Sequence, residues 1–347
     1  MKEEYREFDA MVRNRLERHF NAPAQPKTTM MAKKVAIEAA IPGWQPISWY
    51  EERGVTGLPP VTFEDQANAI VECVKAGASI IHTHPRDPET GMTAHMHPVG
   101  SPESRHAYCL MEVMDRAYKE IDFVCAHHTW WGKPDKGAQA DFISQTKLLL
   151  ELGKAKGLGN WYVQSVLIMT EGNFDVGHAI FDVESIQEGV KWMEANGVKP
   201  LVEIECFAIP RVKQHLIDTG LLKEPFWAVI QEGKHSDDRA FGGDPWTQLE
   251  IITSLGLARQ ALGEGTFLGI APAGRNWLTM ATMALLGGAE MIRVGIEDQF
   301  YLYPHKDDIS QRASDTTAMV VNLAKALGRE VATPQDVRER IGIKLTK

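Results

Sequence analysis

Two histidines separated by a single residue, His82 and His84, close an apolar run of the sequence. The run extends from Ala78 to Pro85, and its pattern is typical of a buried strand that stops at a proline. Alternate side chains of a strand point the same way, so both imidazoles share a face from which Thr83 points away. Imidazole is the commonest protein ligand for zinc, and a catalytic zinc needs three protein ligands. The spacing therefore predicts two of three ligands.

The best third ligand is Glu297, which directly follows an apolar run near the C-terminal end of the sequence. Two histidines and a carboxylate suit zinc or another divalent metal, and the small Gly295 lets other groups approach. Arg293 has the same strand parity as Glu297, so it is expected to face the interior and stabilise negative charge. Asp298 is a candidate general base.

A second pair with the same spacing, His95 and His97, lies in a loop between Gly91 and Pro98. Whether this pair takes part in metal binding is left open, because no strand fixes the geometry of the loop.

Eight apolar runs alternate with segments of helical spacing from residue 34 onward. Such alternation predicts parallel strands joined by helical crossovers. The count of eight favours a closed (β/α)8 TIM barrel over an open doubly wound sheet, and no G-x-G-x-x-G follows the first strand. The expected strands are 34–41, 79–84, 121–128, 161–169, 199–207, 226–231, 266–271 and 289–296. The expected helices are 63–76, 101–119, 140–154, 184–196, 210–219, 246–262, 275–286 and 310–327.

The first 33 residues differ from this pattern. Residues 2–20 place apolar side chains three to four apart, as on one stripe of an amphipathic helix, and residues 21–29 resemble a linker. We expect residues 1–33 to form an N-terminal helical arm and linker, and residues 34–347 to form the catalytic barrel. The arm is expected to pack on the outside of the barrel or on a neighbouring subunit.

Polar side chains gather where the predicted strands end, which is where barrels keep their active sites. Buried groups of this kind are costly unless they are paired or bind metal, so their accumulation predicts a functional site. Besides the residues named above, these side chains include His127, His128 and Thr129 at the end of the third strand, Ser165 on the fourth, and Glu203 and Glu205 on the fifth.

Composition excludes several classes of protein. The chain has 44% hydrophobic residues and a formal net charge of -9, without a sustained basic block, so neither nucleic acid nor an anionic membrane is an expected partner. Its four cysteines show no C-x-x-C spacing, and no apolar run is long enough to span a membrane. Reduced thiols and a cytoplasmic location fit best.

Four stretches of the chain carry a family likeness: Ala39–Gly43, Ala76–Asp87, Gly287–Gln299 and Ala332–Gln335. They resemble the β-keto acid cleavage enzyme family, whose named member is the 3-keto-5-aminohexanoate cleavage enzyme. The resemblance implies a zinc-dependent (β/α)8 barrel, usually a homo-oligomer such as a dimer or tetramer. It also implies a reaction in which a β-keto acid and acetyl-CoA give acetoacetate and a new acyl-CoA. In the family pattern His82, His84 and Glu297 match the metal ligands, and Arg293 and Asp298 match catalytic positions.

The sequence departs from the family around the expected substrate. Gln45 stands where the aminohexanoate enzyme has an acidic residue, so recognition of a substrate amino group is not expected to carry over. His127, His128 and Thr129 replace a short Ser/Thr-Gly-Gly stretch, and Ser165 corresponds to a Ser/Thr of the fourth strand. These five residues are the expected substrate-binding set.

Two other functions remain as alternatives. One is a metal-dependent TIM-barrel hydrolase, which also uses H-x-H on a strand but needs further histidines on strands five and six. The other is a non-catalytic barrel that binds a keto acid or a metal as a sensor; the presence of both Arg293 and Asp298 argues against it.

Overall fold

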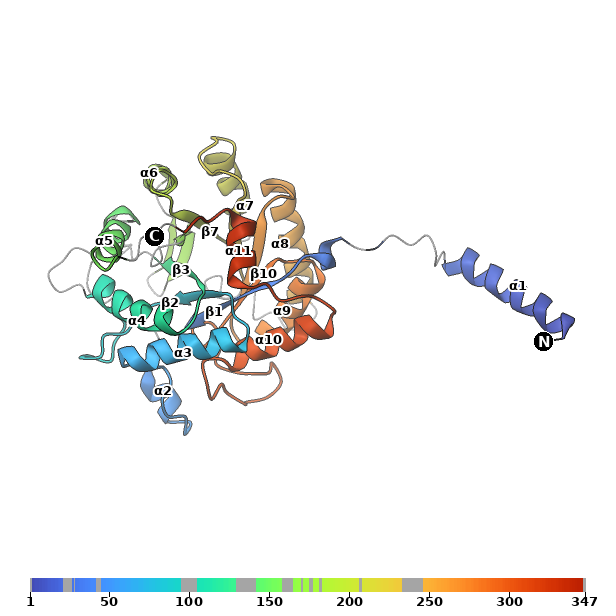
Figure 1. Cartoon of the computed structure of the whole chain (residues 1–347), viewed down its shortest axis with the longest axis horizontal. Coiled ribbons are helices and arrows are strands. Elements are labelled where there is room, and N and C mark those ends of the chain that lie inside the picture. The colour runs from blue at the N-terminus through green and yellow to red at the C-terminus, as the bar shows by residue number, and fades with distance from the viewer. Residues whose placement is uncertain are drawn as a thin grey trace.

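The fold is an eight-stranded barrel surrounded by helices, with one helix held apart from it (Figure 1). It is described from a computed structural model of the chain. The structure describes residues 2–20, 27, 29–41, 45–94, 105–128, 142–157, 165–169, 171–174, 177–180, 183–205, 208–232 and 246–345.

All eight predicted strands form, and they close into a parallel barrel in the order β1-β10-β9-β8-β7-β4-β3-β2. The prediction of a (β/α)8 TIM barrel is therefore confirmed. The strands are β1 (Ala36–Ile41), β2 (Ile80–Thr83), β3 (Val124–His128), β4 (Ser165–Met169), β7 (Lys199–Glu205), β8 (Trp227–Glu232), β9 (Phe267–Pro272) and β10 (Met291–Val294).

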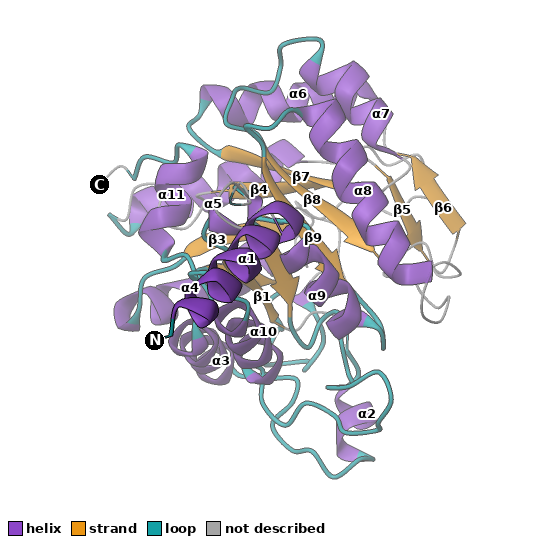
Figure 2. Ribbon diagram, turned by 90° about the vertical axis from the view of Figure 1, so that its right-hand side faces the viewer, coloured by secondary structure: helices purple, strands orange, loops and turns teal. Residues whose placement is uncertain are grey.

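The helices lie around the outside of the strands (Figure 2). Those predicted within the barrel domain also form, with small shifts at their ends. They are α3 (Phe63–Ala76), α4 (His106–Glu120), α5 (Phe142–Ala155), α6 (Val183–Ala195), α7 (Ile209–Val212) with the π-helical turn η6 (Lys213–Ile217), α8 (Trp246–Leu262), α9 (Trp277–Leu286) and α10 (Asp315–Ala326).

Five short elements were not predicted. Helix α11 shows the reason. A capping box between Thr333 and Asp336 begins this helix, but eight residues are too few to show a clear helical period of apolar side chains. The unpredicted elements are the 3-10 turn η2 (Met30–Ala32), α2 (Ile47–Glu51), the hairpin strands β5 (Glu171–Phe174) and β6 (Gly177–Ile180), and α11 (Pro334–Ile341).

Local sequence explains the boundaries of the best-defined helix, α3. The Thr62 side chain accepts a hydrogen bond from the Asp65 backbone amide at its start, and Gly77 ends it with a positive φ of 116°. Its buried face packs toward β1, all six residues of which are buried. Burial on both faces is the condition under which a parallel strand reads as a continuous apolar run.

The barrel closes where β1 pairs with β10, and this seam positions the functional residues. Glu38 lies opposite Arg293, and on the other side of β1 Ala40 lies opposite His82. After β10 the chain comes so close to β1 that a Cβ on Gly295 would lie 2.1 Å from the Ala40 carbonyl oxygen. Glycine at this position lets the segment carrying residues 297 and 298 cross over the end of β1.

The predicted N-terminal helix forms as α1 (Glu3–Phe20) and projects away from the barrel (Figure 1). The chain joins the barrel near Lys33, which makes a 2.8 Å ion pair with the buried Glu290. Both residues precede strands, so the arm leaves from the end of the barrel opposite the strands' C-terminal ends. Among the helices that the structure describes, none combines the length and apolar character needed to cross a membrane.

Candidate active site

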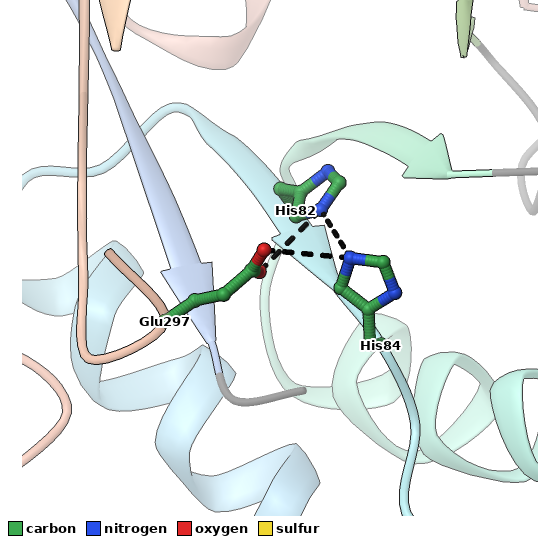
Figure 3. A group of neighbouring side chains, drawn as sticks. All are labelled: His82, His84 and Glu297. Carbon is green, nitrogen blue, oxygen red and sulfur yellow. Dashed lines mark hydrogen bonds and ion pairs between the residues drawn. The ribbon is translucent and has the colours of Figure 1, made fainter. Parts of the chain in front are cut away.

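His82, His84 and Glu297 converge at the C-terminal end of the barrel (Figure 3). All three are buried, and their ligand atoms lie within 4.8 Å of one another. The Nε2 atoms of the two histidines are 3.1 Å apart, and the Glu297 carboxylate oxygens lie 3.5 Å from Nε2 of His82 and 3.4 Å from that of His84. The sequence prediction that these three residues come together is therefore correct.

The hydrogen bonding of His82 indicates what this cluster can hold. Its Nδ1 lies 2.9 Å from the backbone carbonyl oxygen of Ala126, which can only accept, so Nδ1 carries the proton. In the neutral ring, Nε2 then presents a lone pair toward His84 and Glu297. A ligand nitrogen about 2.0–2.1 Å from a tetrahedral zinc is about 3.3 Å from its neighbour, close to the spacing here. The donor set fits a divalent metal ion.

Arg293 joins this cluster to Asp298. Its Nε donates to Asp298 at 2.8 Å, and its Nη2 donates to Asp298 at 3.2 Å and to Glu297 at 2.9 Å (all buried). Burial opposes the charge of the guanidinium, but the carboxylates of Asp298 and Glu297 hold the pKa of Arg293 well above its usual value. One permanent cation thus orients both carboxylates, which is consistent with the predicted placement of all three residues.

A carboxylate that was not predicted as part of the site lies beside Arg293 on the neighbouring strand. Glu38 on β1 is fully buried, with one oxygen 3.8 Å from Nη1 of Arg293. Burial, reinforced by the charges of Asp298, Glu203 and Glu297 and opposed by Arg293, raises its pKa to about 8. The signal was present in the sequence, since Glu38 is the one charged residue of the run Ala36–Ile41.

The opposite wall of the barrel carries Glu203 on β7 and Gln231 on β8, both buried, and Gln231 donates a hydrogen bond to Glu203. These are the fifth and sixth strands of the barrel, and neither contains a histidine. The arrangement does not match the histidines that the hydrolase alternative requires there. The backbone of Glu205 ends β7, and its side chain is outside the described part of the structure.

Gln45, predicted from the sequence to bind substrate, lies beside Glu297. It is buried, and its Nε2 donates to the backbone carbonyl of Glu297. Arg86, which follows the H-x-H motif and was not assigned a role, donates to the carbonyls of Gln45 and Gly91. Arg86 therefore fixes the loop after β1 against the loop after β2, at the edge of the metal-type cluster.

The remaining predicted residues are only partly described. The backbones of His127 and His128 form the C-terminal end of β3, and Ser165 begins β4 as the register partner of Ala126. The side chains of these three residues, and the whole of Thr129, lie outside the described residues, as do His95 and His97. Their proposed contacts remain predictions.

This barrel carries one histidine on β2, a second directly after β2 and a carboxylate after β10. Such a set at the C-terminal end defines a metal-dependent TIM-barrel type of site. A family profile described as beta-keto acid cleavage enzyme matches residues 34–115 and 142–343. The chain belongs to the β-keto acid cleavage enzymes, as the motifs indicated.

Curated relatives in this family carry related names. The 3-dehydrocarnitine:acetyl-CoA trimethylamine transferase of Rhizobium meliloti is 26% identical over 83% of this chain and 90% of its own length. The 3-keto-5-aminohexanoate cleavage enzyme of Fusobacterium nucleatum is 25% identical over 90% of this chain and all of its own. The 3,5-dioxohexanoate:acetyl-CoA acetone transferase of Paraburkholderia graminis is 24% identical over 82% of this chain and 89% of its own.

A solved structure shares the fold. The ternary complex of ObcA with a C4-CoA adduct and oxalate aligns with a TM-score of 0.63 at 16% identity, covering 82% of this chain and 68% of ObcA. This likeness independently supports the barrel architecture.

Proposed function

We propose that this enzyme transfers an acetyl group from acetyl-CoA to a β-keto acid and releases acetoacetate and a new acyl-CoA. The observation that carries the proposal is the convergence of His82, His84 and Glu297 beside the Arg293–Asp298 pair in a chain of this family. The names of relatives that use acetyl-CoA support the cosubstrate.

The overall exchange conserves all atoms. The carbon between the carbonyl and carboxylate of the β-keto acid forms a bond to the acetyl carbonyl carbon, and the CoA sulfur leaves. The thiolate then attacks the original ketone carbon, whose bond to that same carbon breaks. The substrate's acyl group leaves on CoA. The two-carbon carboxylate fragment leaves joined to acetyl, and its carbon takes back the proton that was removed first, which gives acetoacetate.

We propose that His82, His84 and Glu297 hold Zn²⁺, with the protonated Nδ1 of His82 anchored on Ala126. Bound zinc supplies Lewis-acid polarisation, which increases the acidity of a carbon beside a carbonyl. Because the donor set alone would also accept other divalent metals, metal analysis of the purified protein decides the identity of the ion.

Asp298 is proposed as the base that takes the proton from the carbon between the two carbonyl groups. Arg293 holds the Asp298 carboxylate through two donated hydrogen bonds, so its oxygens have a fixed direction. The same guanidinium is proposed to offset the negative charge that develops on substrate oxygens. Asp298 and Arg293 thus act as one unit, and the loss of either is expected to stop proton removal.

Gln45, His127, His128, Thr129 and Ser165 are proposed to contact the substrate. Among the described residues, no group donates a hydrogen bond to the buried Oε1 of Gln45. A neutral acceptor at this position suits a substrate that offers a hydroxyl or amide donor, whereas a carboxylate would favour an ammonium group. We therefore propose a β-keto acid without a cationic substituent beside Gln45.

A substrate screen tests the proposal. The zinc-loaded enzyme is incubated with acetyl-CoA and β-keto acids whose far ends are neutral, cationic or anionic, and acetoacetate and acyl-CoA are quantified. Equal amounts of both products from a neutral-ended acid support the proposal. Consumption of the keto acid without a new acyl-CoA contradicts it and favours a hydrolytic activity.

We also propose the setting in which the enzyme works. The family match begins at residue 34, which supports division into an arm of residues 1–33 and a catalytic barrel of residues 34–347. Cys73 and Cys109 are free and buried thiols, which supports a reducing, cytoplasmic location. The protein is proposed to act as a homo-oligomer, without nucleic-acid or membrane partners.

A further inference from the structure

Helix α1 exposes its apolar side chains to water. It projects from the barrel (Figure 1), and none of its described side chains is buried. Tyr5, Phe8, Met11 and Leu16 are 56%, 62%, 58% and 48% exposed. Most of the stability of helices in proteins comes from packing of an amphipathic face, so a packing partner for this face is expected to stabilise α1.

The exposed apolar residues form a narrow seam. Tyr5, Phe8, Val12 and Leu16 are three or four residues apart, so they lie one above another along the helix. At 1.5 Å per residue the seam is about 16 Å long. A stripe of this width is typical of a helix that packs against a single helix, whereas a helix docked on a globular core needs a wider apolar face.

The charges of α1 are separated along its length. The N-terminal half is acidic and the C-terminal half is basic, with Arg6 and Glu17 as exceptions, and the described charges nearly cancel. The helix dipole favours this order only in the first and last turns. Nearer the middle, Asp9 and Arg13 form an ion pair of 2.9 Å within the helix, but neither this pair nor the dipole accounts for Glu7 and Arg15. The acidic residues are Glu3, Glu4, Glu7 and Asp9, and the basic residues are Arg13, Arg15 and Arg18.

We propose that α1 pairs in an antiparallel arrangement with α1 of a second copy of this chain. A two-fold axis near the middle of the seam places Phe8 against Val12 of the partner subunit and Tyr5 against Leu16 of the partner subunit. The acidic half of each helix then lies along the basic half of the other. A parallel pair would bring like charges together instead.

The position of the arm keeps this pair away from the catalytic end. Lys33 anchors the root of the arm on Glu290, at the N-terminal ends of the strands. The nine peptide links from Phe20 to Thr29 can span up to about 30 Å, so pairing of the helices does not require the barrels to touch. We therefore expect pairing to leave substrate access unchanged. The inference rests on the proposed self-association and not on the proposed reaction.

Disulfide trapping in the full-length protein tests the arrangement. Tyr5→Cys and Leu16→Cys chains carry different affinity tags, are mixed and are oxidised gently, with the wild-type chain as the control for native cysteines. The proposal predicts a disulfide between the two different chains and little within either chain type alone. Tyr5→Cys chains that crosslink to each other as readily, or an absence of crosslinks, would overturn it.

Charge substitutions test the role of the separated halves. Arg13→Glu, Arg15→Glu and Arg18→Glu together make the arm acidic, and Glu3→Lys, Glu4→Lys and Glu7→Lys together make it basic. When the same set of substitutions is present in both the Tyr5→Cys chain and the Leu16→Cys chain, the two arms carry like charge. The crosslink yield is then expected to fall about tenfold, since several like-charge contacts act together. One acidic arm and one basic arm should restore the yield. A crosslink yield that stays the same in all of these charge variants would contradict the proposal. Turnover is measured in parallel, because it reports separately on the catalytic site.

Discussion

Glu38 allows the electrostatics of the barrel interior to be tested without altering a proposed metal ligand. The substitution Glu38→Gln keeps the shape of the side chain and removes its ability to ionise. Burial raises the pKa of Glu38 from 4.5 to about 8, so the folded chain keeps a proton that the unfolded chain loses above pH 4.5. Stabilisation by this proton is complete below pH 4.5 and is lost as the pH rises through 8.

The size of the effect follows from the two pKa values. Between pH 5 and pH 8 the free energy of unfolding of the wild-type chain should fall, relative to that of Glu38→Gln, by about 3 to 4 kcal/mol. The assay is urea unfolding across this pH range, with a chelator present so that metal binding does not add to the stability.

Glu290→Gln is a control in which folding shifts the carboxyl pKa in the opposite direction. Glu290 is also buried, but hydrogen bonds from Arg340 and Lys33 outweigh its burial and lower its pKa. Its stabilisation is present above the unfolded pKa and lost as the pH falls, so between pH 5 and pH 8 this variant should show little relative change. If the difference between wild type and Glu38→Gln is constant or grows with pH, the account of Glu38 as a protonated interior group is wrong.

Three further substitutions test the site. His82→Ala should remove most bound zinc, measured by elemental analysis, and all turnover; full activity would refute the metal assignment. Asp298→Asn should retain zinc but lose deuterium exchange at the carbon between the two carbonyls of a bound β-keto acid, and unchanged exchange would remove Asp298 as the base. Gly295→Ala should destabilise the fold by about 3 kcal/mol or more, because its Cβ would collide with the Ala40 carbonyl. Gly263 is the control, because its φ is 90° but no atom lies within 4 Å of an added Cβ. Gly263→Ala should lower the free energy of unfolding in urea by only about 1–2 kcal/mol. Equal losses in the two variants would contradict the close approach at Gly295.

The barrel and the metal-type cluster could be predicted because their signals are local and periodic. Parallel strands buried on both faces leave continuous apolar runs, and the two-residue spacing of His82 and His84 predicts a shared direction at the end of β2. Glu297 followed from the rule that barrel sites gather at strand ends.

The parts that were missed depend on distant contacts. Glu38 acquires its significance from Arg293, which is far away in sequence and adjacent only because β1 and β10 pair. The role of Arg86 likewise depends on where the carbonyls of Gln45 and Gly91 lie after folding. Neither contact leaves a periodic pattern in the sequence, because each forms only when the barrel closes and brings distant residues together.

The fate of isotope label in acetyl-CoA tests the central claim most directly. The zinc-loaded enzyme is given acetyl-CoA labelled with ¹³C at both acetyl carbons, together with an unlabelled β-keto acid that it accepts in the screen. We expect acetoacetate labelled at its ketone and methyl carbons and a new acyl-CoA without label in its acyl group. Unlabelled acetoacetate, or release of labelled acetate with no new acyl-CoA, would contradict acetyl transfer to the β-keto acid.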